Sequence, residues 1–251
     1  MKLGIVGKGG VGKTTVSALL ARSYADDGAR VLAIDTDSNP NLGVSLGLTL
    51  AEMESQPVLP RSLIVGTGGG TDSAALVRDY ACATPSGVSL LSAIKVNEAG
   101  AGCMCGGHAT VRSLLGAALE EQADVAIVDM EAGLEHLSRS GGTLAHADVL
   151  LVVMEPTRKS VLTASRTAIL AEELGIPRTV AVGNKARSEA DAEFFRTACA
   201  GYGVPLAGVL SFADAVVSAD LAGGVVDTER GERIRREIAE LRDYLTGAPV
   251  S

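Results

Sequence analysis

Residues 7–15 constrain the fold of this chain most, because they fit the pattern G-x-x-x-x-G-K-[ST]. A short apolar run at residues 3–6 precedes them, and a helical pattern of apolar and small residues follows to about Ala25. A strand, a glycine-rich loop and a helix in this order make a phosphate cradle. The glycines let backbone N–H groups turn inward, and the helix adds the positive end of its dipole. The residues expected to line this cradle are Gly7, Gly9, Gly10, Val11, Gly12, Lys13, Thr14 and Thr15.

Two side chains of the loop have expected roles of their own. Lys13 is expected to reach the β- and γ-phosphates of a nucleotide, and the Thr14 hydroxyl is expected to bind Mg²⁺. The alternative is a glycine-rich turn that contains a lysine by chance. The strand and helix on either side favour the phosphate loop.

The remaining apolar runs alternate with helical patterns, which predicts βαβ units. We therefore expect an α/β fold with a doubly wound, mostly parallel sheet and helices on both faces. The expected strands are residues 3–6, 31–34, 88–91, 125–128, 149–153, 180–182 and 206–210, with 64–65 as a further candidate. The expected helices are residues 13–25, 71–80, 108–122, 158–174, 188–200 and 228–245. No repeat or linker is visible, so we expect one P-loop ATPase domain over 1–246 and a short tail over 247–251.

Composition limits the partners. The formal net charge is −8 with a pI of about 5.0, and no basic block occurs, which argues against a nucleic-acid footprint. No apolar run is long enough to span a membrane, and the chain begins on its first strand. We therefore expect a cytoplasmic protein that binds neither nucleic acid nor membrane. In that compartment the 4 cysteines are expected to be metal ligands or core residues, not disulfides.

Acidic residues follow two of the expected strands. Asp35 and Asp37 end the second strand, and Asp129 follows the apolar run at 125–128. Carboxylates at the carboxyl ends of parallel strands beside a phosphate loop are well placed for metal and water chemistry. Asp129 is at the position of the acid that holds the magnesium water shell in P-loop proteins. The alternative for Asp35 and Asp37 is a role in capping or in a turn.

Asn184 and Lys185 bear on the choice of base. GTPases with an Asn-Lys-x-Asp motif use its acid to accept two N–H groups of guanine, but here Arg187 stands at that position. The Asn184 amide can instead pair with the donor and acceptor edge of adenine. We therefore expect ATP as the nucleotide.

Cys103 and Cys105 form the second unusual motif, between glycines. Alternate residues of an extended segment face the same side, so both sulfurs can face one metal ion. Soft metals take four ligands, and a two-fold axis would bring a second pair from another chain. Four sulfurs suit Ni²⁺ in a plane or Zn²⁺ in a tetrahedron. Structural burial of the pair is the alternative.

The other candidate ligands of a soft metal are single residues. His108 either replaces one thiolate or caps the helix that it begins. Cys82 and Cys199 stand alone in helical patterns and are expected to be core residues.

The phosphate loop carries a second lysine, Lys8, and in this it resembles the deviant Walker A ATPases of the MinD, ParA and nitrogenase-iron-protein group. In that group the extra lysine crosses a dimer interface to the partner's nucleotide. The resemblance therefore implies a homodimer with ATP between subunits and Lys8 acting on the neighbouring site. The alternative for Lys8 is a solvated loop charge.

The same resemblance implies roles for the two switch segments. Asp37 would orient the attacking water, and Asp35 would support the magnesium shell. Glu131 and Gly133 would form the second switch, with the Gly133 backbone approaching the γ-phosphate. The group often has proline after the first-switch acid, whereas this chain has Ser38.

Three segments together resemble the CooC-type ATPases, which act in nickel insertion during carbon monoxide dehydrogenase maturation. They are the C-x-C motif, D-M-E-A-G-L-E-H-L at 129–137 and V-M-E-P-T-R at 153–158. The resemblance runs over about residues 1–245. It implies ATP hydrolysis coupled to nickel loading into an apo carbon monoxide dehydrogenase-type client.

Two other functions remain open at this stage. The cysteines suit an iron–sulfur carrier or ATP-dependent electron donor of the nitrogenase-iron-protein branch. The second open function is a positioning ATPase of the ParA or MinD type, which uses ATP to bind DNA or membrane. The acidic net charge argues against it.

Overall fold

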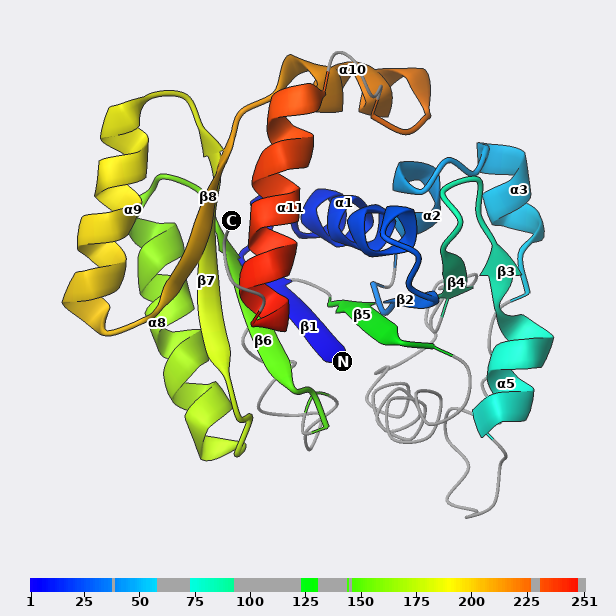
Figure 1. Ribbon diagram of the computed structural model, residues 1–251, viewed down its shortest axis with the longest axis horizontal. Helices are drawn as coiled ribbons and strands as arrows, with labels where there is room; N and C mark the ends of the chain where they lie inside the picture. The colour runs from blue at the N-terminus through cyan, green and yellow to red at the C-terminus, as the bar shows by residue number, and fades with distance from the viewer. Residues whose placement is uncertain are drawn as a thin grey trace, which may run out of the picture.

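The computed structural model describes residues 1–37, 39–57, 73–92, 123–130, 144, 146–226 and 231–247. Its centre is an eight-stranded sheet in the order β3-β4-β2-β5-β1-β6-β7-β8 (Figure 1). The strands are β1 Lys2–Gly7, β2 Val31–Asp35, β3 Cys82–Ala83, β4 Ser89–Ser92, β5 Val125–Asp129, β6 Val149–Met154, β7 Thr179–Ala186 and β8 Leu206–Ser211.

All strand pairs of this sheet are parallel except β3 with β4, an antiparallel pair at one edge. The central strand β1 lies between β5 and β6. From β1 the chain goes first to β2 on one side and later, after β5, to β6 on the other. The order of the strands therefore reverses at β1, and ligands of open α/β sheets bind at the carboxyl ends of strands at such a point.

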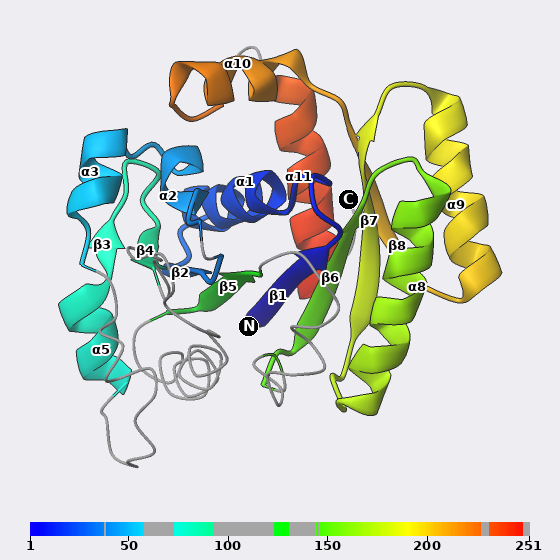
Figure 2. The ribbon, with the colours of Figure 1, turned by 180° about the vertical axis from the view of Figure 1, so that it is seen from behind.

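Helices cover both faces of the sheet (Figures 1 and 2). The described helices are α1 Lys13–Asp26, α2 Leu42–Ser45, α3 Leu50–Ser55, α5 Ser73–Tyr80, α8 Arg158–Glu173, α9 Glu189–Tyr202, α10 Asp214–Ala222 and α11 Glu232–Thr246. Among the described residues, no helix is both long and apolar enough to cross a membrane.

The two faces have separate cores because successive residues of a buried parallel strand point to opposite sides. On one face, Leu3 and Ile5 of β1 pack in a cluster with side chains of α1, α2, α10 and α11. On the other, Val6 belongs to a cluster with side chains of α5, α8 and α9. Both faces of β1 are therefore covered, which fixes the position of the loop that follows it.

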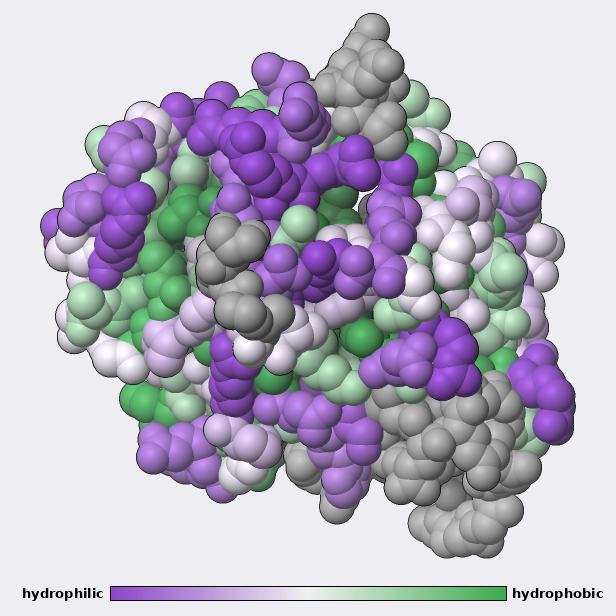
Figure 3. Space-filling model, viewed as in Figure 1, coloured by the Kyte–Doolittle hydropathy of each residue, from purple (hydrophilic) through white to green (hydrophobic). Residues whose placement is uncertain are grey.

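The last helix, α11, closes the first of these faces. Ile234, Ile238, Leu241 and Leu245 recur at helical spacing and are at most 3% exposed. Its outer face carries charged residues, and Figure 3 shows a largely hydrophilic surface there. The predicted helix at 228–245 is confirmed over Glu232–Thr246.

Most predicted elements are confirmed within one to three residues of their expected ends, but four of the elements in the described residues were not predicted. The helices α2, α3 and α10 and the edge strand β3 are the additions. The prediction that Cys82 belongs to a helix is wrong, because it lies in β3, where it is half-buried against the core. Cys199 is buried in α9, as predicted. The predicted strand at 64–65 and helix at 108–122 lie outside the described residues.

Candidate nucleotide-binding site

The phosphate loop joins β1 to α1, and two of its glycines are required by the packing around them. Gly12 has a φ of 94°, and a Cβ built on it would lie 2.5 Å from Asn184 Nδ2. Gly7 has a φ of 152°, and its Cβ would lie 2.5 Å from the Val153 carbonyl oxygen. Neither position accepts a side chain, so the loop lies in close contact with β6 and β7.

The helix that follows the loop is open at its amino end. Gly12 is the N-cap of α1, no side chain caps the helix, and its first turn carries no acid. The first N–H groups of a helix have no partner within the helix, and they carry the positive end of its dipole. This end of α1 is therefore suited to bind phosphate.

Lys13 lies over the loop. Its side chain is 8% exposed, and its Nζ lies 3.5 Å from the carbonyl oxygen of Lys8. The ammonium group thus faces the space that the loop encloses, as expected for a contact to nucleotide phosphates.

Asp35 and Asp129 are neighbours at the carboxyl ends of β2 and β5, where they are directly paired in the sheet register. They are 1% and 2% exposed, respectively. Asp35 accepts hydrogen bonds from the backbone N–H groups of Asp37 at 3.1 Å and Leu42 at 3.0 Å. Asp129 accepts one from Ser17 Oγ at 3.1 Å. The pair is therefore held by its own chain.

Burial raises the pKa of both carboxyl groups. The pKa of Asp35 rises to about 7, first because of burial and then because of the charge of Asp129. Burial also raises the pKa of Asp129 to about 6, although hydrogen bonds from Thr14 and Ser17 and the charge of Lys13 oppose this shift. Two adjacent buried acids store unfavourable charge, which a bound cation relieves.

Asp37 lies near the acid pair, since its charge also raises the pKa of Asp35 and of Asp129. It is half-buried, and its Oδ1 accepts a hydrogen bond from the backbone N–H of Asn39 at 2.9 Å. Thr36, between the two acids, donates from its hydroxyl to the Asp129 carbonyl oxygen at 2.8 Å. The loop after β2 is thus joined to the end of β5.

The oxygen atoms gathered here suit Mg²⁺. Thr14 supplies a hydroxyl, and the neighbouring Asp35 and Asp129 supply carboxylates. Hard oxygen ligands with one or two carboxylates, completed by water and nucleotide phosphates, are the usual shell of this ion. The side chains present therefore fit the predicted cofactor.

Lys8 differs from these residues because it is exposed at the tip of the loop. Its backbone oxygen accepts hydrogen bonds from Lys13 Nζ and the Val11 N–H, both at 3.5 Å. Its ammonium group forms no ion pair within the described part of the chain. This placement leaves the side chain accessible to another molecule.

Asn184, which is expected to pair with adenine, lies against the phosphate loop. Its Nδ2 donates to the Val11 carbonyl oxygen at 2.8 Å, and its Oδ1 accepts from the Lys185 N–H at 2.9 Å. The side chain is 8% exposed, and these two bonds use one of its two N–H donors and one of its two acceptor positions, so the contact to adenine stays a prediction. Lys185 also contacts the phosphate loop, because its Nζ donates to the Gly10 carbonyl oxygen at 2.6 Å.

Ser17 is a site residue that was not predicted. It is fully buried on α1, one turn after Lys13, and it donates to Asp129. Residues four apart share a helix face, so the position of Lys13 was the available signal. Ser17 joins the helix of the phosphate loop to the acid at the end of β5.

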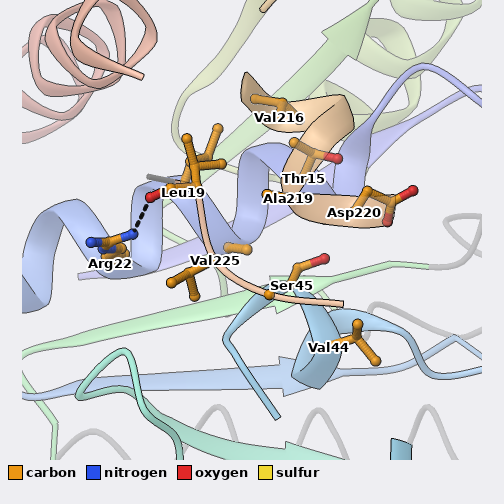
Figure 4. Close-up of a pocket in the computed structure, with 12 residues that line it drawn as sticks. Thr15, Leu19, Arg22, Val44, Ser45, Val216, Ala219, Asp220 and Val225 are labelled. Carbon is orange, nitrogen blue, oxygen red and sulfur yellow. Dashed lines mark hydrogen bonds between the residues drawn. The ribbon is translucent and has the colours of Figure 1, made fainter. Parts of the chain in front are cut away.

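A narrow groove lies on the other side of Thr15, between α1, α2 and α10 (Figure 4). Leu19, Val44 and Val225 line it with apolar side chains. Arg22 donates to the Val226 carbonyl oxygen at 2.9 Å and so ties the segment after α10 to α1. The groove lies where α2 and α10 pack around the first turns of α1.

The remaining predicted site residues lie outside the described residues. They are the switch residues Glu131 and Gly133 and the candidate ligands Cys103, Cys105 and His108. Where the structure does describe the chain, no cluster of three or more His, Cys, Asp or Glu side chains suits a metal ion. The shared metal site therefore stays a prediction.

The comparisons with known proteins agree with this geometry. The model of the CobQ/CobB/MinD/ParA nucleotide binding domain matches residues 5–226. The carbon monoxide dehydrogenase accessory protein CooC of Rhodospirillum rubrum is 35% identical over 89% of this chain and 88% of its own length. An uncharacterized ATP-binding protein of Methanocaldococcus jannaschii is 31% identical over 98% of this chain and 97% of its own.

A solved structure shows the same fold. The MinD cell division protein of Aquifex aeolicus superimposes with a TM-score of 0.74 at 20% identity, over 100% of this chain and 98% of that one. The predicted fold class is confirmed.

Proposed function

The chain belongs to the CobQ/CobB/MinD/ParA nucleotide-binding family and is an ATPase related to CooC, and from that premise we propose that it is a nickel metallochaperone. In this proposal it dimerises with ATP and holds nickel between two C-x-C motifs. It then assists insertion of the metal into a carbon monoxide dehydrogenase-type client.

One observation carries the proposal. The similarity to CooC of R. rubrum extends over 89% of the chain, and that protein is an accessory protein of carbon monoxide dehydrogenase. The chain also contains the paired thiols of Cys103 and Cys105, which suit a soft metal better than a hard one. Neither feature is required for ATP hydrolysis alone.

The described site supports the nucleotide part of this function. Lys13 and the amino end of α1 bind the phosphates, and Asp37, near the acid pair, orients water for attack. Asp35, Asp129 and Thr14 hold the magnesium shell, and the ion neutralises charge on the transferred phosphoryl group. Each role falls on a residue that the fold brings to the carboxyl ends of β1, β2 and β5.

ATP acts in this proposal as a switch of assembly. In this role Lys8, which is exposed on the phosphate loop, contacts the nucleotide of a second copy. Dimerisation brings four thiolates together, so the ATP-bound dimer has the complete ligand set and the separate chains have half of it. Hydrolysis loosens the dimer and releases nickel, because only a difference in affinity between two states can drive such a change.

An anaerobic nickel titration with and without a non-hydrolysable ATP analogue tests the proposal. We expect the analogue to tighten nickel binding, and nickel to tighten the binding of the analogue by the same factor. Cys103→Ser and Cys105→Ser should each abolish tight binding, because each removes two of four ligands. Nickel affinity should also fall as the pH is lowered, since thiolates must be deprotonated to ligate.

Cys82→Ser and Cys199→Ser are the matched controls, because both thiols lie within the fold in β3 and α9. They should leave the nickel affinity unchanged. A brown protein whose cysteines hold iron and sulfide would contradict the proposal and favour an iron–sulfur carrier. Nickel binding that ignores the analogue would contradict the switch.

A further inference from the structure

Thr36 lies between Asp35 and Asp37 in the loop after β2, and its side chain is fully buried. Its backbone N–H and its Oγ1 both donate to the carbonyl oxygen of Asp129, at 3.1 and 2.8 Å. A carbonyl oxygen has two acceptor positions, so Thr36 alone fills both of them. The end of β5 is therefore joined twice to the residue that precedes Asp37.

The hydroxyl of Thr36 points away from the phosphate site. It lies 3.5 Å from Met130 Sδ, and Met130 belongs to the core on the face of α5, α8 and α9. Asp35 instead accepts from Leu42, which belongs to the core on the face of α1 and α2. Because Thr36 is also fully buried, its hydroxyl has no direct access to a nucleotide at the amino end of α1. Any effect of this hydroxyl on hydrolysis must pass through the backbone.

The end of β5, to which Thr36 is joined, is held from two other sides. Ser17 of α1 donates to the Asp129 carboxylate at 3.1 Å. The next residue, Met130, donates from its N–H to the Ile5 carbonyl oxygen at 3.1 Å. The end of β5 is thus tied to α1 and to β1, and it gives the loop after β2 a fixed point of attachment.

Asp37 itself is held by local hydrogen bonds. Its N–H donates to Asp35 Oδ1 at 3.1 Å, and its own Oδ1 accepts from the Asn39 N–H at 2.9 Å. The last pair of the β2–β5 ladder is Asp35 with Asp129. Beyond that pair, the two bonds from Thr36 are the ones that join the described part of the loop to β5. The position of Asp37 relative to β5 therefore depends on Thr36.

We propose that Thr36 is a positioning residue for ATP hydrolysis, because its hydroxyl holds the adjacent Asp37 in place relative to the end of β5. The inference rests on the proposed role of Asp37 in orienting the attacking water. A misplacement of about 1 Å can cost about 10²-fold in rate, so a small shift of this loop is enough to lower turnover. Binding of ATP does not depend on the hydroxyl, since the phosphate loop and α1 keep their own contacts.

The test separates turnover from binding in the full-length protein with Mg²⁺. We expect Thr36→Val to lower kcat for phosphate release about tenfold, while the KM for ATP and the affinity for a non-hydrolysable analogue stay within about twofold. Thr36→Ala removes the same hydroxyl without adding bulk and should lower kcat at least as much. Thr36→Ser keeps the hydroxyl, and its kcat should lie within about twofold of that of the wild type.

Thr84→Val is the matched control. The N–H and Oγ1 of Thr84 both donate to the Val88 carbonyl oxygen, at 3.0 and 2.8 Å, and Thr84 is 7% exposed. Its bonds are therefore those of Thr36, but Thr84 lies between β3 and β4, at the end of β4 opposite to the acids. Thr84→Val should leave kcat unchanged.

A double variant shows whether Thr36 acts through Asp37. Asp37→Ala removes the group that Thr36 positions, so adding Thr36→Val should have no further effect, and the two changes should be non-additive. We expect the turnover of the double variant to equal that of Asp37→Ala. A further tenfold loss would contradict the inference, because Thr36 would then act independently of Asp37.

The single variants can also overturn the inference. Wild-type kcat in Thr36→Val or Thr36→Ala would do so, and so would an equal loss of kcat in Thr84→Val, because turnover would then follow stability. A loss of ATP affinity as large as the loss of kcat would assign Thr36 to binding. Wild-type turnover in Asp37→Ala would instead overturn the proposed role of Asp37, on which the inference rests.

Discussion

Two parts of the nucleotide site differ in exposure and in their contacts. They are the acid pair at the ends of β2 and β5 and the lysine at the tip of the phosphate loop. Asp35 and Asp129 are 1% and 2% exposed and receive hydrogen bonds from their own chain. Lys8 is exposed, and its side chain pairs with no acid in the part of the chain that the structure describes.

This difference separates two tasks. Buried groups that one chain holds in place are set before any ligand arrives, so they suit the binding of magnesium and phosphate. An exposed charge on the same loop is available to a second molecule. The contrast predicts that changes to the buried groups alter single-chain properties, and that changes to Lys8 alter assembly.

The largest effect is expected at Asp37, which lies between these extremes. Asp37→Ala should keep the affinity for ATP and lower turnover by about 10²- to 10⁴-fold, the range for a lost general base or water-orienting group. Phosphate release and nucleotide binding would be measured on the same preparation. Lys13→Ala is the reference for lost binding, and an equal loss of ATP affinity in Asp37→Ala would assign Asp37 to binding and not to catalysis.

The acid pair should make the free protein less stable as the pH rises. In the folded chain the pKa of Asp35 is raised from 3.8 to about 7 and that of Asp129 to about 6, so the folded state binds more protons than the unfolded state between these limits. Without magnesium and nucleotide, the free energy of unfolding should fall by several kcal/mol between about pH 4 and pH 7. Denaturant unfolding across this range measures it.

Two variants separate the pair from other groups. Asp35→Asn should flatten the pH profile, because the amide does not titrate. Asp124→Asn should not, because Arg30 holds the pKa of the Asp124 carboxyl down to about 2, outside the window. If the free energy of unfolding of the wild-type protein rises between pH 4 and pH 7, the buried acids are not the origin of its pH dependence.

A smaller effect is expected for Lys8→Ala, and it should appear only in assembly. The folded monomer and its affinity for ATP should persist, while ATP-driven dimerisation weakens about a hundredfold, as for the loss of two hydrogen bonds to charged groups, one at each nucleotide of the symmetric dimer. Light scattering with an ATP analogue measures this. Lys2→Ala, at the opposite end of β1, is the control; dimerisation of Lys8→Ala equal to that of the control would remove Lys8 from the interface.

The smallest effect is expected for Ser17→Ala, which removes one of the hydrogen bonds to Asp129. The magnesium dependence of ATP binding should shift by about fivefold, in line with about 1 kcal/mol for a buried hydrogen bond. Thr167→Val removes a buried hydroxyl of α8 that bonds to the Thr163 carbonyl oxygen, far from the acids. If both variants show the same magnesium dependence, Ser17 serves the fold and not the site.

The sequence was sufficient to predict the sheet because its central strands are continuous apolar runs. It was less informative at the short elements. The helix α2 has 4 residues and α3 has 6, too few for a helical period, although Thr49 and Glu52 form the capping box that begins α3. The strand β3 pairs over two residues only, so it depends on its contact with β4 and not on a local pattern.

The site could be predicted where a motif determines the backbone conformation. It could not be predicted where a side chain has several possible hydrogen-bond partners. The phosphate loop, Asp35 and Asp129 lie where strand and loop order requires. Asn184 was expected to contact adenine, but the hydrogen bond from its amide to the Val11 carbonyl oxygen, 173 positions away in the chain, was not predicted. The stack of Arg187 on Phe212 joins the ends of two strands in the same way, and no local pattern in the sequence indicates it.

The stoichiometry of metal binding tests the central claim most directly. A metal site shared by two chains requires both the ATP-bound dimer and the cysteines of each chain, so the number of nickel ions per chain reports on all of them. Anaerobic protein would be saturated with nickel in the presence of an ATP analogue, and the metal content and the molar mass would be measured together across a range of chain concentrations. The account predicts about one nickel ion per two chains and a dimer that forms as the metal binds. One tightly bound ion per monomer, independent of chain concentration, would contradict it and leave Cys103 and Cys105 as a local site.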